Sequence, residues 1–303
     1  MGPRPSNTGV YPCGPGTVPP APSHRWDWYR ASVPATPELV LYALQKALET
    51  RDGTKGTLTP GRPRYSFKQA QIVSCASGHR VCEVLYGGQN PHPCVDASGE
   101  SAEFVAGVLR ENGTHYVSRG DVAVDRSAPG LFASWSALCL DLAKLYGLQC
   151  RVVASPTDPD AGSTVYLGSR KSEVFMRVYE RGKKVARDEG VAPDEMHRYR
   201  DAVRAELEFK PKKRLMKQAL GSTAPEALWG VTVWLQHFAR EAFAMNAEPI
   251  NFRQRREADH QRALRAVGTQ YGRHLERLYR DCGYDDAESF RTLRDYAGIP
   301  DHS

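Results

Sequence analysis

The chain has 303 residues, 41% of them hydrophobic, and a formal net charge of +6. This length exceeds a usual single domain but falls short of two large ones, so it predicts one core domain with a helical extension. The positive charge favours a polyanionic partner. No apolar run approaches the ~18 residues of a membrane span, and no basic segment followed by an apolar core opens the chain, so we expect neither a membrane-inserted nor a secreted protein.

The N-terminal part of the chain predicts a tail followed by alternating strands and helices. Residues 1–25 are rich in proline and glycine and hold few side chains to bury, which indicates a disordered tail. The expected elements after it are a strand, a helix, a hairpin of two strands and a second helix, over residues 26–33, 36–51, 64–73, 80–86 and 101–112. The seven cysteines of the chain show no C-x-x-C or zinc-finger spacing, so we expect reduced thiols in a cytoplasmic protein.

Residues 115–125 predict a strand with two different faces. Val122 and Val124 alternate with a charged set that points the other way, composed of Arg119, Asp121 and Asp125. A helix with an apolar stripe is expected over residues 131–146 and would cover the apolar face of the sheet.

A second hairpin is expected over residues 164–168 and 174–180. Its second strand places Val174, Met176 and Val178 on one face and the set Phe175, Arg177 and Tyr179 on the other. Helical stretches at residues 183–189 and 194–202 lead to a further strand, residues 203–210, whose polar face is wholly ionic. The ionic residues of that strand are Arg204, Glu206, Glu208 and Lys210. Beyond it, helices are expected over residues 225–245, 256–282 and 285–297.

Three of these segments carry a family resemblance. They are RGDVAVD at residues 119–125, YLGSRKSEVFMRVYERGKK at residues 166–184 and VRAELEFK at residues 203–210. Together they resemble the replication initiation factor (Rep_trans) family, the rolling-circle replication initiators of filamentous phages and plasmids. The resemblance continues weakly from about residue 26 to residue 296.

The resemblance implies site-specific nicking and rejoining of DNA at an origin through a covalent phosphotyrosine intermediate. Tyr179 is the expected nucleophile, with Tyr166, Tyr116 and Tyr199 as rivals. A phenol has a pKa near 10, so it needs help to attack a phosphodiester at neutral pH. Arg177, Arg119 and Lys183 are the cations expected to neutralise the scissile phosphate.

The resemblance also implies a Mg²⁺ or Mn²⁺ cofactor held by carboxylates. Asp121 and Glu206 are the first expected ligands, with Glu208 and Asp125 behind them. Asp121 and Asp125 lie about 13 Å apart along a strand, so a single metal ion would use one of them.

The expected partner is DNA, as a single-stranded or cruciform nick site with flanking duplex. The residues expected to bind it are Arg170, Lys171, Arg204, Lys210, Lys212, Lys213 and Arg214. A host helicase and a second copy of the chain are further candidate partners. We expect the catalytic and DNA-binding α+β core at residues 26–217, with a mainly antiparallel β-sheet covered by helices on one face, and a C-terminal helical region at residues 218–303.

Other interpretations remain open from the residues alone. A plain antiparallel sheet with one solvated face would show the same charged strands. A DNA-binding regulator that kept the fold without the chemistry is the main functional alternative, and an RNA-binding protein is a third. No phosphate-binding loop and no internal repeat is evident in the sequence.

Overall fold

The computed structural model describes residues 24–298 except for residues 156, 159–160, 191–200 and 251–258. The chain forms two compact units, Met1–Phe252 and Arg253–Ser303. In the described residues, no helix is both long and apolar enough to cross a membrane. The predicted tail and the predicted helical stretch at residues 194–202 lie almost wholly outside the described residues.

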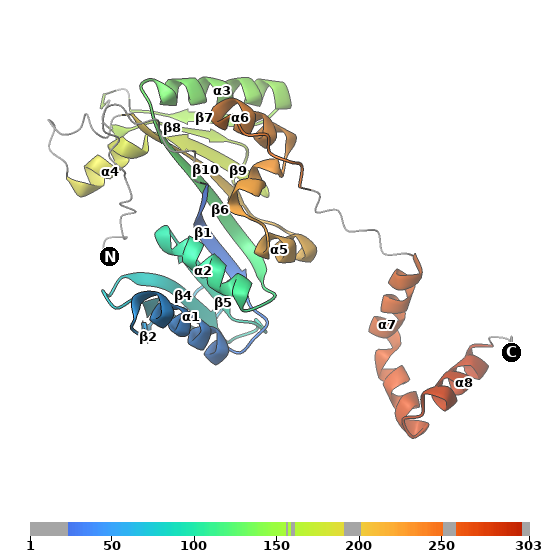
Figure 1. Cartoon of the computed structure of the whole chain (residues 1–303). Helices are drawn as coiled ribbons and strands as arrows, with labels where there is room; N and C mark the ends of the chain where they lie inside the picture. The colour runs from blue at the N-terminus through green and yellow to red at the C-terminus, as the bar shows by residue number, and fades with distance from the viewer. Residues whose placement is uncertain (1–23, 156, 159–160, 191–200, 251–258, 299–303) are drawn as a thin grey trace. The chain divides into compact units, whose positions relative to one another are not determined.

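The first unit is built on one 10-stranded sheet in the order β2-β3-β4-β5-β1-β6-β10-β9-β8-β7, and every pair of neighbours is antiparallel (Figure 1). The strands are β1 (Arg25–Ser32), β2 (Thr57–Pro60), β3 (Gln69–Ser74), β4 (Arg80–Tyr86), β5 (Cys94–Ser98), β6 (Tyr116–Ser127), β7 (Cys150–Val153), β8 (Thr164–Leu167), β9 (Val174–Tyr179) and β10 (Ala202–Phe209).

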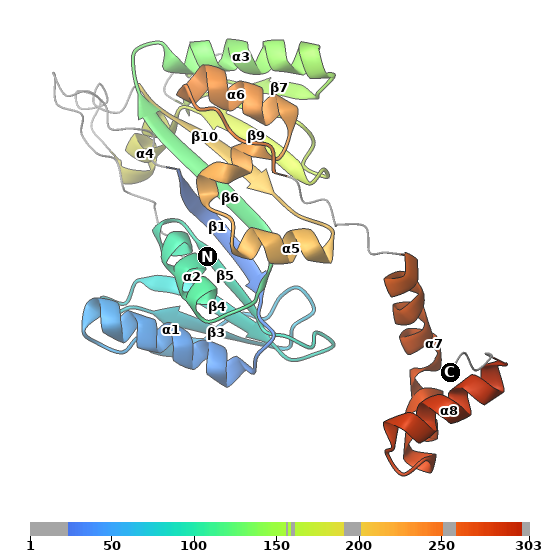
Figure 2. The same cartoon turned by 45° about the vertical axis from the view of Figure 1, so that its right-hand side comes forward.

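The helices of this unit follow the strands in a regular way. They are α1 (Pro37–Asp52), α2 (Glu100–Glu111), α3 (Leu131–Tyr146), α4 (Arg181–Glu189), α5 (Arg214–Gly221), the 3₁₀ helix η3 (Pro225–Gly230) and α6 (Val233–Phe243). Figure 2 shows α1, α2, α3, α5 and α6 on the same face of the sheet. The predicted α+β class, with a mainly antiparallel sheet covered by helices on one face and helices at the C-terminus, is therefore confirmed.

The sheet contains the same chain path twice. The first half runs β1, α1, β2, β3, β4, β5 and α2, and the second runs β6, α3, β7, β8, β9, β10 and α5, with α4 inserted before β10. In each half the last strand pairs with the first, β5 with β1 and β10 with β6, and the two first strands pair with each other at the centre. No repeat was expected from the sequence, because the two halves share a path rather than a residue pattern.

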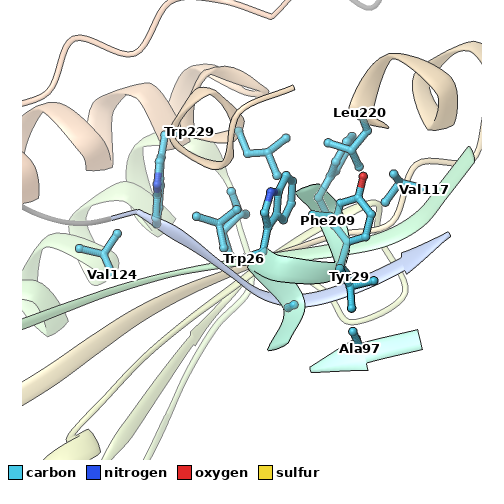
Figure 3. Close-up of a cluster of buried hydrophobic side chains, with 14 of the residues drawn as sticks. Trp26, Tyr29, Ala97, Val117, Val124, Phe209, Leu220 and Trp229 are labelled. Atoms are coloured by element: carbon cyan, nitrogen blue, oxygen red, sulfur yellow. The ribbon is translucent and has the colours of Figure 1, made fainter. Parts of the chain in front are cut away.

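The core lies between the helices and the apolar face of the sheet. Figure 3 shows Trp26 and Trp229 among buried residues that come from both halves of the sheet. Trp26 packs against Gly120 of β6, where an added Cβ would come within 2.6 Å of the indole ring. A side chain at residue 120 would therefore displace one of the largest residues of this core.

Helix α4 lies on the other face of the sheet. It begins directly after β9, and Arg181 donates a hydrogen bond to Asp125 of β6, which belongs to the polar face. Lys184 lies with its Nζ 5.8 Å from the centre of the Tyr179 ring. Helix α4 thus covers one end of the polar face, beside the tyrosine.

Several boundaries differ from those expected. The short strands β2 and β5 were not predicted, and the helix expected over residues 225–245 is interrupted because Thr232 caps a new helix by accepting a hydrogen bond from the Leu235 amide. Helix α5 packs on β6, and α6 packs on α3, so both belong to the first unit and the division falls at residue 252 rather than at residue 217. The second unit holds α7 (Asp259–Asp281) and α8 (Asp286–Ala297), close to the predicted bounds of these two helices.

Candidate active site

The polar face of the second half brings together side chains from three neighbouring strands. Opposite residues of antiparallel strands share a face, and the pairing sets Tyr166, Arg177 and Glu206 in one row across β8, β9 and β10. In the next row, Glu208 lies opposite Asp121 of β6. The expected face is therefore assembled by strand register.

Tyr179 and Glu206 place a hydroxyl next to a carboxylate that could accept its proton. The Tyr179 hydroxyl donates a hydrogen bond to Glu206 Oε2 over 3.4 Å. The other oxygen of Glu206 accepts from Arg177, whose guanidinium carbon lies 5.8 Å from the centre of the Tyr179 ring. Burial raises the pKa of Tyr179, and the negative charge of Glu206 raises it further, so the phenol is protonated at neutral pH.

Asp121 lies beside this pair and is held by Arg119. Arg119 donates from Nε to Asp121 Oδ1 over 2.9 Å, and its Nη2 also pairs with Glu208 over 2.9 Å. Burial raises the pKa of Asp121 to about 7, the hydrogen bond from Arg119 opposes this shift, and the charges of Glu206 and Glu208 add to it. Three carboxylates thus share one electrostatic neighbourhood.

Asp125 belongs to a separate network of arginines. Arg204 donates to both of its oxygens, over 2.6 and 2.7 Å, while Arg25 and Arg181 donate to Asp125 Oδ2 over 2.7 and 3.1 Å. Arg204 also bonds Asp27 over 2.9 Å. The guanidinium groups lower the pKa of Asp125 despite its burial.

This network involves two residues with other expected roles. Arg204 is only 2% exposed and donates to Asp125 and Asp27, so in this structure its guanidinium faces acids of the sheet, and the expected DNA contact at this residue stays a prediction. Asp125 gives its oxygens to three arginines rather than to the carboxylate neighbourhood of Asp121. Both residues fix β6 and β10 to each other and to β1.

The remaining expected cations lie at the ends of the strands. Lys183 pairs with Glu180 over 2.7 Å in α4, and Lys210 pairs with Glu208 over 2.6 Å directly after β10. Arg214 donates to the Tyr116 hydroxyl over 3.0 Å. The other members of the set, Arg170, Lys171, Lys212 and Lys213, have exposed side chains.

The rival tyrosines lie in different settings. Tyr166 shares the polar face with Tyr179 but stacks on Phe175, with ring centres 5.8 Å apart. Tyr116 contacts Arg214 at the far end of β6. Tyr199 lies outside the described residues. Of the tyrosines that can be compared, Tyr179 is the one hydrogen-bonded to a carboxylate of the site.

Part of the chain is similar to a known protein family. A family model described as replication initiation factor matches residues 148–289, which include β8, β9 and β10. The chain is similar to this family over that region, which is a little under half of its length.

Two further comparisons accompany the family match. The rolling-circle replication initiator protein from Geobacillus stearothermophilus is a solved structure similar to this chain, with 14% identity and a TM-score of 0.48. The match covers 76% of this chain and 100% of that one. No curated protein matched the sequence.

The carboxylates of the polar face are the residues that could hold a metal ion. In the part of the chain that the structure describes, no group of three or more His, Cys, Asp or Glu side chains is arranged to hold one. The oxygens of Asp121, Glu206 and Glu208 face Arg119 and Arg177. Their chemistry still fits a hard cation, because several carboxylates share one neighbourhood and their mutual repulsion contributes to the raised pKa of Asp121.

Sequence reasoning missed several residues of the polar face. Asp27 and Arg181 complete the Asp125 network, and Trp28 lies under Arg119, whose guanidinium carbon is 4.2 Å from the indole centre. Asp27 sits at a bulge in β1, which changes the face that its side chain occupies. A bulge leaves no period in the sequence, so alternation could not have found Asp27.

Proposed function

We propose that the protein initiates rolling-circle replication by nicking one DNA strand at an origin and later rejoining it. The observation that supports this proposal is the hydrogen bond from the Tyr179 hydroxyl to Glu206, beside Arg177, within the region that matches the replication initiation factor model. A hydroxyl bonded to a carboxylate is the arrangement that a nucleophile and its base require.

The proposed step is a transfer of the DNA phosphoryl group to Tyr179. The phenolic oxygen attacks the scissile phosphorus while its proton passes to Glu206 Oε2. The bond from phosphorus to the 3′ oxygen breaks, which leaves a 5′ phosphotyrosine and, once that oxygen has taken a proton from solvent, a free 3′ hydroxyl. Rejoining is the reverse reaction, in which the 3′ hydroxyl attacks the phosphotyrosine.

The neighbouring side chains have supporting roles in this proposal. Arg177 and Arg119 neutralise the charge that develops on the phosphate. Asp121, Glu206 and Glu208 are the residues that would hold Mg²⁺ or Mn²⁺, which would polarise a non-bridging oxygen of the phosphate. Asp125 and Arg204 position the strands, and the exposed cations Arg170, Lys171, Lys212 and Lys213 contact the DNA backbone.

The proposal is tested by covalent capture of DNA. The protein is incubated with a labelled oligonucleotide from the DNA flanking its gene, with Mg²⁺, with Mn²⁺ and with chelator, and the denatured mixture is separated by electrophoresis. We expect a protein–DNA band that needs the metal ion, is absent in Tyr179→Phe and persists in Tyr116→Phe. DNA binding by Tyr179→Phe should stay within about twofold of the original, because only one oxygen is removed.

Two outcomes would contradict the proposal in different ways. A band that persists in Tyr179→Phe would move the nucleophile to another tyrosine. Specific binding without any band in the unaltered protein, across all metal conditions, would favour the non-catalytic DNA-binding regulator.

A further inference from the structure

A pocket of about 510 Å³ opens on the polar face at the edge of the second half of the sheet. Its lining includes the aromatic residues Tyr166 and Phe175 and the arginines Arg151 and Arg170, together with Gln149, Cys150, Gly168 and Ser169. No carboxylate is part of this lining. Its size is within the ~300–1,000 Å³ range of small-ligand sites, and its charge is positive.

The aromatic and cationic groups of the pocket are stacked. The rings of Tyr166 and Phe175 lie at 18° to each other. The guanidinium carbon of Arg151 is 5.1 Å from the centre of the Tyr166 ring, and that of Arg170 is 5.4 Å from the centre of Phe175. Flat rings flanked by guanidinium groups are the combination with which proteins hold an unpaired base and its phosphate.

Strand pairing connects the pocket to the candidate active site. Arg151 of β7 lies opposite Tyr166 of β8, which lies opposite Arg177 of β9. Neighbouring strands are about 4.8 Å apart, so Tyr166 lies about 10 Å from Glu206 along this row. The pocket and the Tyr179–Glu206 pair therefore open on one continuous face.

We propose that this pocket binds one unpaired nucleotide of the DNA strand that is nicked, close to the scissile phosphate. The base stacks against Tyr166, and Arg151 and Arg170 neutralise its phosphate. A base within a duplex is already stacked on its neighbours, so the pocket selects single-stranded DNA. This inference rests on the proposed function for the identity of the strand, and it gives Tyr166 a binding role in place of a nucleophilic one.

The first experiment measures binding without any reaction. A fluorescein-labelled single strand and the same sequence as a duplex are titrated with protein in chelator, and affinity is read from fluorescence anisotropy. We expect Tyr166→Ala to weaken single-strand binding by about 5- to 100-fold and to leave duplex binding unchanged, since one base–aromatic stack is lost. Tyr166→Phe keeps the ring and should bind as the original does.

A matched control and a second variant keep the experiment decisive. Tyr42 is 58% exposed on α1, outside the polar face, so Tyr42→Ala should leave both affinities unchanged. If Tyr166→Ala does not fold, Arg151→Gln replaces an exposed pocket residue and should weaken single-strand binding selectively. Equal loss for single strand and duplex, or no loss in either pocket variant, would overturn the proposal.

The second experiment locates the nucleotide. An abasic residue is moved along the single strand, and each substrate is titrated with the original protein and with Tyr166→Ala. We expect one position at which the missing base weakens binding in the original but not in the variant, because the two changes remove the same stack. Additive losses at every position would contradict the pocket even if Tyr179 forms the adduct, whereas a coupled position without any adduct would keep the pocket and refute the nicking proposal.

Discussion

The two halves of the sheet follow the same chain path, but their buried acidic residues have different hydrogen-bond partners. In the first half, Glu83 of β4 lies opposite Asp96 of β5, and both are almost fully buried. Arg64 pairs with both acids, and Arg30 pairs with Asp96 over 3.0 Å. In the second half, the acid in the corresponding strand, Glu206, is bonded to a tyrosine as well as to an arginine.

A covering segment explains much of this difference. Between β2 and β3 the chain crosses the polar face of the first half, where Phe67 packs with Ala70, Leu85 and Cys94. Arg64, from the same segment, completes the pairing of the acids. The second half has a pocket and Tyr179 on this face instead. Buried carboxylate–arginine pairs therefore occur in both halves of the sheet and do not by themselves mark a site. The second half differs because its acid is bonded to Tyr179 and a pocket opens on the same face.

The largest expected effect separates the two acids directly. Glu206→Gln keeps the shape of the side chain but removes the charge that accepts the Tyr179 proton, so we expect the rate of adduct formation to fall about 100- to 1,000-fold. Asp96→Asn is the matched change in the first half and should leave the rate per folded molecule within about threefold. Single-turnover adduct formation measures both.

A loss of stability is also expected for the variant in the first half. Asp96 accepts from Trp28, Arg30 and Arg64, so Asp96→Asn should lower the free energy of unfolding by about 1–3 kcal/mol in urea titrations. A large loss of rate in Asp96→Asn, or an unchanged rate in Glu206→Gln, would erase the functional distinction between the halves.

An intermediate effect is expected where the two halves meet. Gly120→Ala should lower the free energy of unfolding by about 1–3 kcal/mol, because the new methyl group would overlap the Trp26 ring. Gly107 in α2 has nothing within 4 Å of an added Cβ, so Gly107→Ala should be neutral or stabilising by up to about 1 kcal/mol. Equal urea midpoints for the two variants would mean that the central strands are not tightly packed.

The smallest expected effect is a pH dependence of stability that arises where the central strands β1 and β6 of the two halves meet. The Tyr29 hydroxyl of β1 lies 2.7 Å from His115 Nε2, next to β6, and burial lowers the pKa of His115. At this imidazole the unfolded chain therefore binds a proton more readily than the folded one, so the contribution of His115 to stability is constant above about pH 6.5 and falls as the pH drops below it. The raised pKa of Asp121 contributes in the opposite direction. Burial also lowers the pKa of His24, which contributes in the same direction as His115.

His115→Gln should flatten this dependence without abolishing it, because His24 still titrates. Urea unfolding at several values between pH 7.5 and pH 5 measures the slope, and His79→Gln, at an exposed position, is the control. A slope of stability against pH that is the same in His115→Gln as in the original protein would show that protonation of His115 does not affect stability.

The alternation of the strands explains what could be predicted from the sequence. In β9 the aliphatic residues Val174, Met176 and Val178 alternate with Phe175, Arg177 and Tyr179, and in residues 203–210 apolar and charged residues alternate. The face that carries Tyr179, Arg177 and Glu206 could therefore be assigned before any pairing was known. β5 was missed because four of its five residues are buried, Asp96 among them, and a strand buried on both faces shows no alternation.

Contacts between distant segments could not be predicted in the same way. Arg204 and Asp125 are 79 residues apart, and their direct pairing depends on β10 lying beside β6. Arg204 has the same place in the alternation as Glu206, so the sequence favoured a DNA contact there. Only the bulge at Asp27 and the insertion of α4, which surround Arg204 with acceptors and a second arginine, explain why it is buried.

The pairing of β9 with β10 has a consequence for how preparations of this protein should be judged. A shift of one residue between these strands would turn Glu206 toward the core and bring Leu207 to the surface. The alignment that joins the proposed nucleophile to its base is therefore the same alignment that buries the apolar side chains. A molecule with these two strands out of register would therefore also have an exposed apolar face and would not be correctly folded. Specific activity would then report the fraction of correctly folded molecules in a preparation.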